Sequence, residues 1–224
     1  MRHINIPIFI PHLGCPNQCI FCNQRHISGT VNFDENEVEN NIKSVLSTVK
    51  QDDECEIAFF GGSFTGIDRE LMVRLLDIAQ KYVNSGYVIG IRMSTRPDYI
   101  NEEIVNILKG YKITFVELGI QSMNDNVLSF LKRGHSSGDT VRASNLLKSA
   151  GIPFVGQMMI GLPTATKNDE IECARRICEL GASASRIYPT LVFYNTELEE
   201  LTRNLVYTPL SVDEAVCRSA EVLH

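Results

Sequence analysis

The chain has 224 residues, of which 44% are hydrophobic and 21% charged, a composition typical of a globular protein with a large core. No apolar run reaches the roughly 18–20 residues of a membrane span, and Pro7 interrupts the apolar stretch 4–10. We therefore expect neither a membrane protein nor a signal peptide. The net charge of −6 weighs weakly against a nucleic-acid surface that covers the whole domain.

Short runs of β-branched or aromatic residues alternate with amphipathic segments along the chain. The predicted strands cover residues 4–10, 56–60, 88–93, 113–118, 154–160 and 184–188. The predicted helices cover residues 35–49, 69–83, 102–108, 125–131 with 140–149, and 169–180, and a further helical pattern runs from residue 211 to the chain end. Six β-then-α units predict parallel strands with right-handed crossovers. They fit either an open partial barrel or a doubly wound sheet, which the pattern alone does not separate.

Three of the seven cysteines follow the first predicted strand. Cys15, Cys19 and Cys22 have the spacing C-x3-C-x2-C on a short loop with Gly14 and Pro16. We expect a cytoplasmic protein, where cysteines are thiols or metal ligands rather than disulfides. A four-iron cubane normally has four cysteine ligands, so three would leave one iron open.

Two other interpretations of this loop remain. The cysteines could bind zinc with His12 or His26 as the fourth ligand, or they could be free thiols around a turn. The other four cysteines have no comparable spacing, and we interpret them as buried or incidental thiols; they are Cys55, Cys173, Cys178 and Cys217.

Polar or glycine-rich segments stand at the end of all six predicted strands. Beyond the cysteines they are residues 61–66, 94–98, 117–122, Gln157 with 161–163, and 188–190. Ligands of parallel α/β folds bind at the carboxyl ends of the strands. The sequence therefore predicts one binding site that all six segments surround.

Some of these residues have an evident chemical use. Gly61 and Gly62 let the backbone approach a ligand closely, and Gln121 offers both a donor and acceptors. Arg133 could pair with a carboxylate as a fork donor, or it could be a solvated arginine that ends a helix. Glu117, near the end of an apolar strand, is predicted to be a paired interior charge or a polar contact.

In their order and spacing, these motifs resemble the radical S-adenosylmethionine (SAM) superfamily, and more narrowly the branch that contains the catalytic subunit of Elongator. Besides the cysteine loop, the similar segments are residues 59–64, 95–99, 116–122, 133–135, 158–163, 188–192 and 196–198. The resemblance implies an α/β fold, a partial (β/α)6 TIM-like barrel with parallel strands. It implies a [4Fe-4S] cluster on Cys15, Cys19 and Cys22. It further implies SAM contacts from six residues: Gly61, Gly62, Ser63, Gln121, Arg133 and Gln157.

The same resemblance implies an enzyme. The open iron would chelate SAM, and an electron from a reductant such as ferredoxin or flavodoxin would release a 5′-deoxyadenosyl radical, plausibly for tRNA base modification. Local candidates for an RNA-binding rim are Arg25, His26, Arg96, Lys132 and Arg133. The alternative is a zinc-stabilised module that binds RNA or a partner without redox chemistry. We expect residues 1–224 to form the radical SAM core barrel, and the helical pattern at the end predicts that the native chain continues beyond His224.

Three positions depart from the pattern of the resembling family. The glycine turn continues with Ser63, where an acidic residue or threonine is common, Ser94 stands where relatives often have glutamate, and Gln157 replaces a histidine or aspartate.

Overall fold

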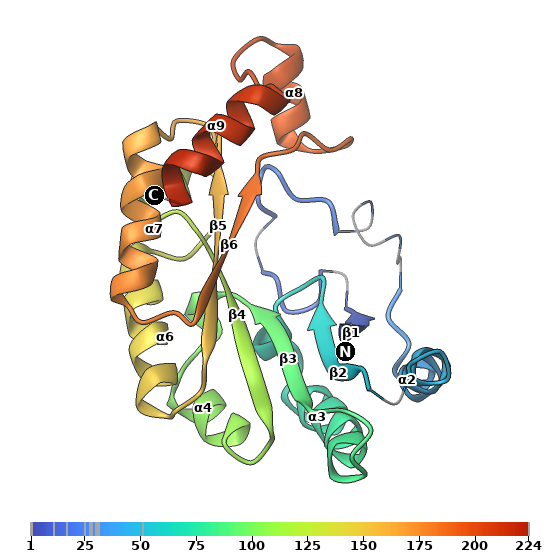
Figure 1. Cartoon of the computed structure of the whole chain (residues 1–224). Coiled ribbons are helices and arrows are strands. Elements are labelled where there is room, and N and C mark those ends of the chain that lie inside the picture. Colours follow the sequence, from blue (N-terminus) through green and yellow to red (C-terminus); the bar gives the residue numbers. More distant parts are fainter. Residues whose placement is uncertain are drawn as a thin grey trace.

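The structure, a computed structural model, describes residues 2–10, 12–16, 18–24, 26, 29, 32–50 and 52–223. Within them, six parallel strands form one sheet in the order β1-β2-β3-β4-β5-β6. The strands are β1 (His3–Phe9), β2 (Glu54–Phe60), β3 (Gly90–Thr95), β4 (Ile113–Gln121), β5 (Phe154–Ile160) and β6 (Ala184–Pro189). A doubly wound sheet reverses its strand order at a switch point, and this sheet does not. The predicted partial (β/α)6 TIM-like barrel is confirmed, because the sheet curls into an open half-barrel (Figure 1).

Most of the helices cover the outer side of the sheet (Figure 1). The helices are α2 (Val38–Leu46), α3 (Arg69–Asn84), α4 (Glu102–Leu108), α5 (Asp125–Phe130), α6 (Ser137–Ser149), α7 (Lys167–Glu179), α8 (Glu197–Arg203) and α9 (Val212–Leu223). Of these, α8 lies beyond the ends of the strands instead (Figure 1). Side-chain caps begin two of the helices: the Asp68 side chain accepts a hydrogen bond from the Leu71 backbone N–H at α3, and the Asn101 side chain accepts one from the Ile104 backbone N–H at α4. Among the described residues, no helix has the length and apolar character that a membrane crossing requires.

Of the six strands only β5 has its predicted bounds, and β3 and β4 differ most from theirs. Strand β3 starts at Gly90 and ends at Thr95, two residues later than predicted, because its ladder with β4 continues to Thr95 opposite Leu118. Strand β4 continues to Gln121 through a register shift between Gly119 and Gln121. Such a bulge re-aims side chains at a strand end, and here it lies at the rim of the predicted site.

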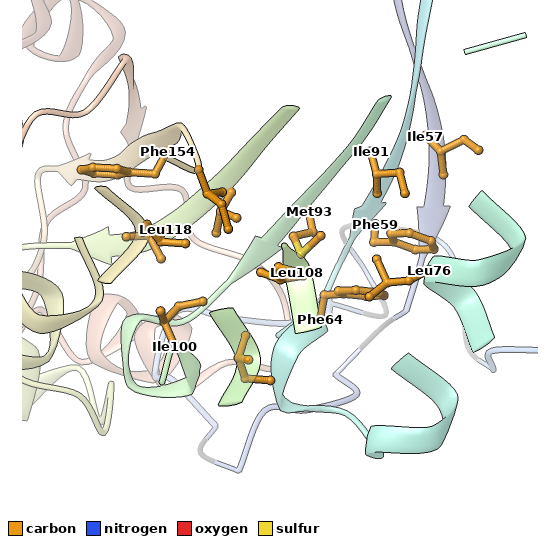
Figure 2. Packing of buried hydrophobic residues seen from close by; sticks show 14 of the residues in the cluster. Ile57, Phe59, Phe64, Leu76, Ile91, Met93, Ile100, Leu108, Leu118 and Phe154 are labelled. Carbon is orange, nitrogen blue, oxygen red and sulfur yellow. The ribbon is translucent and has the colours of Figure 1, made fainter. Parts of the chain in front are cut away.

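The main core lies between the sheet and its helices. Phe59 of β2 stacks on Phe64 with ring centroids 4.3 Å apart, and Leu76 of α3 packs beside them (Figure 2). A second, smaller cluster lies by the carboxyl ends of the strands and includes Ile20, Leu131 and Leu198. It contains a residue of the cysteine loop, so packing in this cluster affects the site.

Candidate functional site

A pocket of about 460 Å³ opens at the carboxyl ends of the strands. All six strands or the loops after them contribute to its lining, as the sequence predicted. Residues that line it include Cys15, Cys19, Cys22, Gly61, Gly62, Thr95, Gln121, Arg133, Gln157 and Tyr188. Every predicted site residue except Ser63 therefore lies in one pocket.

The cysteine loop is held from two sides. The Ile20 backbone N–H donates to Leu131 O at the end of α5 (3.2 Å), and Leu198 N–H of α8 donates to Ile20 O (2.9 Å). Tight turns bring the cysteines close in the loop: Cys22 N–H donates to Cys19 O at 3.0 Å. The loop conformation thus depends on α5 and α8, which lie more than 100 residues further along the chain.

Burial raises the pKa of two of the three cysteine thiols, Cys22 and Cys15. It raises the pKa of Cys22 to about 11, and the neighbouring Cys19 adds to the shift. Burial also raises the pKa of Cys15, against the opposing effect of Arg133 and Arg96. Metal ligation requires thiolates, so loading this site would release protons.

The glycine turn after β2 packs on the backbone of the cysteine loop. Gly61 has φ +93°, a conformation that favours glycine. A Cβ added to Gly62 would lie 2.4 Å from Leu13 O and 2.6 Å from Ile10 O. Gly62 therefore permits a close approach between two parts of the chain itself, in addition to any approach by a ligand.

Ser63 is the predicted site residue whose side chain does not line the pocket. It is fully buried, and its Oγ lies 2.8 Å from Thr95 Oγ1. Its backbone N–H donates to Leu13 O at 3.0 Å. The side chain thus joins the glycine turn to β3, while the backbone joins it to the cysteine loop.

Arg133 is a buried cation in the pocket wall. Its Nη2 donates to Gly119 O at 2.8 Å and its Nη1 to Cys19 Sγ at 3.6 Å. Its buried Nε has no hydrogen-bond partner among the described residues. The interpretation as a solvated arginine is wrong, because Arg133 is only 9% exposed. Such a buried cation favours an anion beside it.

Glu117 is confirmed as a paired interior charge. It is 1% exposed and accepts hydrogen bonds from three side chains: Arg92 (3.1 Å), Gln157 (2.6 Å) and Arg186 (3.0 Å). Gln157 therefore lines the pocket with its amide already fixed to a carboxylate. Arg186, which the sequence analysis did not consider, also lines the pocket and is 40% exposed.

The network continues across the concave face of the sheet. Arg92 Nε lies 3.0 Å from Glu56 Oε2, and His3 Nε2 lies 3.0 Å from the same oxygen. Arg92 also lies over the Phe115 ring, 5.0 Å from its centroid. We call the six residues His3, Glu56, Arg92, Glu117, Gln157 and Arg186 the belt. It takes one residue from each strand and ends at the pocket.

The two histidines near the cysteines are engaged elsewhere. His12 Nε2 accepts a hydrogen bond from Gln24 N–H at 2.9 Å, and the His26 ring meets the Tyr194 ring edge-on at 6.1 Å. In the described part of the chain, no group of three or more His, Cys, Asp or Glu side chains is arranged to hold a metal ion. A zinc ion draws all its sulfur ligands to about 2.3 Å, whereas a four-iron cluster binds each cysteine through a different iron and spaces them more widely.

Two of the five predicted basic-rim residues are turned inward, whereas Lys132 and His26 are exposed. Arg96 is 2% exposed and forms an ion pair with Asp98, Arg133 is buried, and Lys132 is paired with Glu197. Arg25 lies outside the described residues. Arg96 and Arg133 thus contribute to the pocket rather than to an outer RNA-binding face.

The chain resembles known proteins over most of its length. A sequence model of the Radical SAM superfamily matches residues 9–177. The chain belongs to the radical SAM superfamily. It is accordingly an enzyme domain. The alternative interpretation as a zinc-stabilised module without redox chemistry does not explain this membership.

Individual relatives agree with this membership. An uncharacterised protein of Methanocaldococcus jannaschii is 32% identical over 209 residues, 88% of this chain and 63% of that protein. The tRNA uridine(34) acetyltransferase of the same organism is 34% identical over 131 residues, 57% of this chain and 24% of that enzyme. The solved structure of Methanocaldococcus infernus Elp3 with an N-terminal deletion has a TM-score of 0.77 at 24% identity, over 98% of this chain and 53% of that one. The chain thus spans less than two-thirds of each of these proteins, and the predicted resemblance to the Elongator branch is confirmed.

The pocket of this radical SAM domain has the donor set that a [4Fe-4S] cluster and SAM require. Cys15, Cys19 and Cys22 would provide three thiolate ligands and would leave one iron of a four-iron cubane open. The buried nitrogens Arg133 Nε and Arg96 Nη1 have no hydrogen-bond partner among the described residues, so the pocket wall can still donate to an anionic ligand. The residues present therefore fit both groups.

Proposed function

We propose that this chain is the catalytic barrel of a radical SAM enzyme, in which Cys15, Cys19 and Cys22 hold a [4Fe-4S] cluster. When bound there in its reduced form, the cluster would supply the one electron for cleavage of SAM to methionine and a 5′-deoxyadenosyl radical, which would take hydrogen from a substrate. The observation that carries the proposal is the meeting of the three cysteines and the buried Arg133 in one pocket.

Each remaining pocket residue has a role under this proposal. Arg133 presents a guanidinium to the SAM carboxylate, and the turn at Gly61 offers backbone carbonyl groups to its amino group. Gln121, placed by the bulge at the end of β4, donates to and accepts from the polar edge of the nucleoside. Gln157 is held by Glu117 and offers its other amide atoms to the same ligand.

We further propose that the substrate is a base in tRNA. Support comes from the relative named tRNA uridine(34) acetyltransferase. Within the pocket, Arg186 is the belt residue placed to meet such a substrate, because Glu117 fixes its guanidinium and 40% of its side chain stays exposed. The two carboxylates and two arginines of the belt balance in charge. We therefore expect this end of the pocket to receive a neutral carbonyl-bearing ring rather than a phosphate.

The proposal includes a cytoplasmic setting and an electron donor. A ferredoxin or flavodoxin of low potential would reduce the cluster. The pocket itself excludes bulk water from the radical with its aromatic and aliphatic lining, which includes Phe9, Phe21 and Phe60.

Anaerobic reconstitution with iron and sulfide tests the chemistry. The loaded protein should bind about four irons per chain and produce 5′-deoxyadenosine from SAM under reducing conditions. The variants Cys15→Ala, Cys19→Ala and Cys22→Ala should lose both properties. Cys178→Ala, at an exposed cysteine away from the pocket, is the matched control and should keep them. A colourless wild-type protein, or one that holds stoichiometric zinc and ignores SAM, contradicts the proposal.

Comparison of tRNA nucleosides tests the substrate. Cells that lack this protein should lose at least one modified nucleoside, and the Arg186→Ala variant should fail to restore it while still cleaving SAM. Identical nucleoside profiles with and without the protein would exclude tRNA as its substrate.

A further inference from the structure

Side chains donate hydrogen bonds to two of the sulfur atoms. Arg133 Nη1 lies 3.6 Å from Cys19 Sγ, and Gln24 Nε2 lies 3.6 Å from Cys22 Sγ. Two of the three cysteines, Cys19 and Cys22, therefore have a side-chain N–H group directed at their sulfur.

Gln24 is anchored through its backbone. Its backbone N–H donates to His12 Nε2 at 2.9 Å, and His12 N–H in turn donates to Gly61 O at 3.3 Å. The Gln24 side chain reaches back to Cys22, with Nε2 3.6 Å from Sγ. His12 thus supports the backbone of Gln24 beside the sulfur that its amide contacts.

A hydrogen bond to a ligand sulfur affects how easily an iron–sulfur cluster is reduced. Reduction adds a negative charge that spreads onto the sulfurs, and an N–H dipole directed at a sulfur stabilises the reduced state more than the oxidised one. The effect is larger where the sulfur is shielded from water, as Cys22 is in this half-buried loop. Gln24 is neutral, so it acts through this dipole without adding a charge.

We propose that Gln24 is a positioning residue whose amide N–H donates to Cys22 Sγ and raises the reduction potential of the cluster. This inference rests on the proposed function, because it requires Cys22 to bind the cluster. Arg133 acts in the same way on Cys19 and also faces the SAM carboxylate. Gln24 is the better residue to test, because the effect of its hydrogen bond on the cluster can be measured in the absence of SAM.

The test is a potentiometric titration of the anaerobically reconstituted, full-length protein, followed by electron paramagnetic resonance without SAM. The variant Gln24→Leu keeps the approximate size of the side chain and removes the donor. Gln24→Glu keeps the shape and replaces the donor with a negative oxygen. Gln18→Leu is the matched control, because Gln18 is an exposed residue of the same loop that also lines the pocket.

At the wild-type midpoint, the ratio of reduced to oxidised cluster should fall roughly tenfold in Gln24→Leu, which equals about 59 mV for one electron. It should fall further in Gln24→Glu and stay unchanged in Gln18→Leu. Unchanged potentials in the two Gln24 variants would overturn the inference. If neither variant assembles a cluster although Gln18→Leu does, Gln24 serves assembly and the inference is also overturned.

The outcome separates this inference from the proposed function. A wild-type protein that binds no cluster contradicts the proposed function itself. A wild-type cluster that cleaves SAM, together with Gln24 variants of unchanged potential, contradicts the role of Gln24 alone.

Discussion

Replacing Gly62 by alanine tests how the glycine turn shapes the cysteine loop. The added Cβ would lie 2.4 Å from Leu13 O and 2.6 Å from Ile10 O, where ordinary contacts begin near 3.4 Å. Both obstacles are backbone carbonyls, so the two segments must separate by roughly 1 Å. The hydrogen bond from Ser63 N–H to Leu13 O, now 3.0 Å, would then be lost. Overpacking and this loss together predict a fall of about 3 kcal/mol in the free energy of unfolding.

The same separation displaces the loop that carries the cysteines. We therefore expect Gly62→Ala to bind much less iron and sulfide after anaerobic reconstitution, measured alongside urea unfolding. Gly86→Ala is the control: it has φ +75° but nothing within 4 Å of the new Cβ, so it should lose about 1–2 kcal/mol through backbone strain and keep its iron. Wild-type stability and iron content in Gly62→Ala would refute the close approach as the reason for this glycine.

Three further predictions concern the belt, a buried histidine and α8. Arg92→Met should lower the free energy of unfolding in urea by about 3 kcal/mol, because Glu56 and Glu117 lose a shared buried cation; an unchanged midpoint would argue against the belt. Burial and a nearby arginine lower the pKa of His135 to about 4 from 6.5, so stability should decline by up to roughly 3 kcal/mol as pH falls from about 6.5 to 4, and His135→Gln should flatten that slope. Leu198→Ala should cost about 2–4 kcal/mol by leaving a cavity and should reduce iron content, whereas full iron content would show that α8 does not hold the loop.

Much of the fold could be predicted because its signals are local. A parallel strand buried on both sides is a short apolar run, and Asp68 and Asn101 mark helix starts by themselves. The rim residues could be grouped into one site because the carboxyl ends of parallel strands meet at one edge of the sheet. Cys15 and Gln121 were therefore placed together without knowledge of any contact between them.

What the sequence could not provide are contacts between distant segments. Arg133 follows a six-residue helix, and in the sequence it resembles a solvated arginine at a helix end. Positive φ angles at Lys132 and Gly134 instead turn the chain inward. Glu117 and Arg186 meet only because β4 and β6 both border β5. The helix α8 has seven residues and one buried side chain, Leu198, which is too short for a recognisable hydrophobic period.

These distant contacts explain why the proposed cluster site is a property of the whole barrel. The cysteines occupy one short loop, yet Gly62 after β2, Arg133 after α5 and Leu198 in α8 each fix a different part of it. The superfamily match ends at residue 177, before α8 begins. The cysteine spacing thus points to the proposed chemistry, whereas the geometry of the loop arises from packing by segments outside that motif. Because Leu198 holds Ile20 directly beside Cys19, local opening of α8 would reach the proposed cluster ligands through a single hydrogen bond.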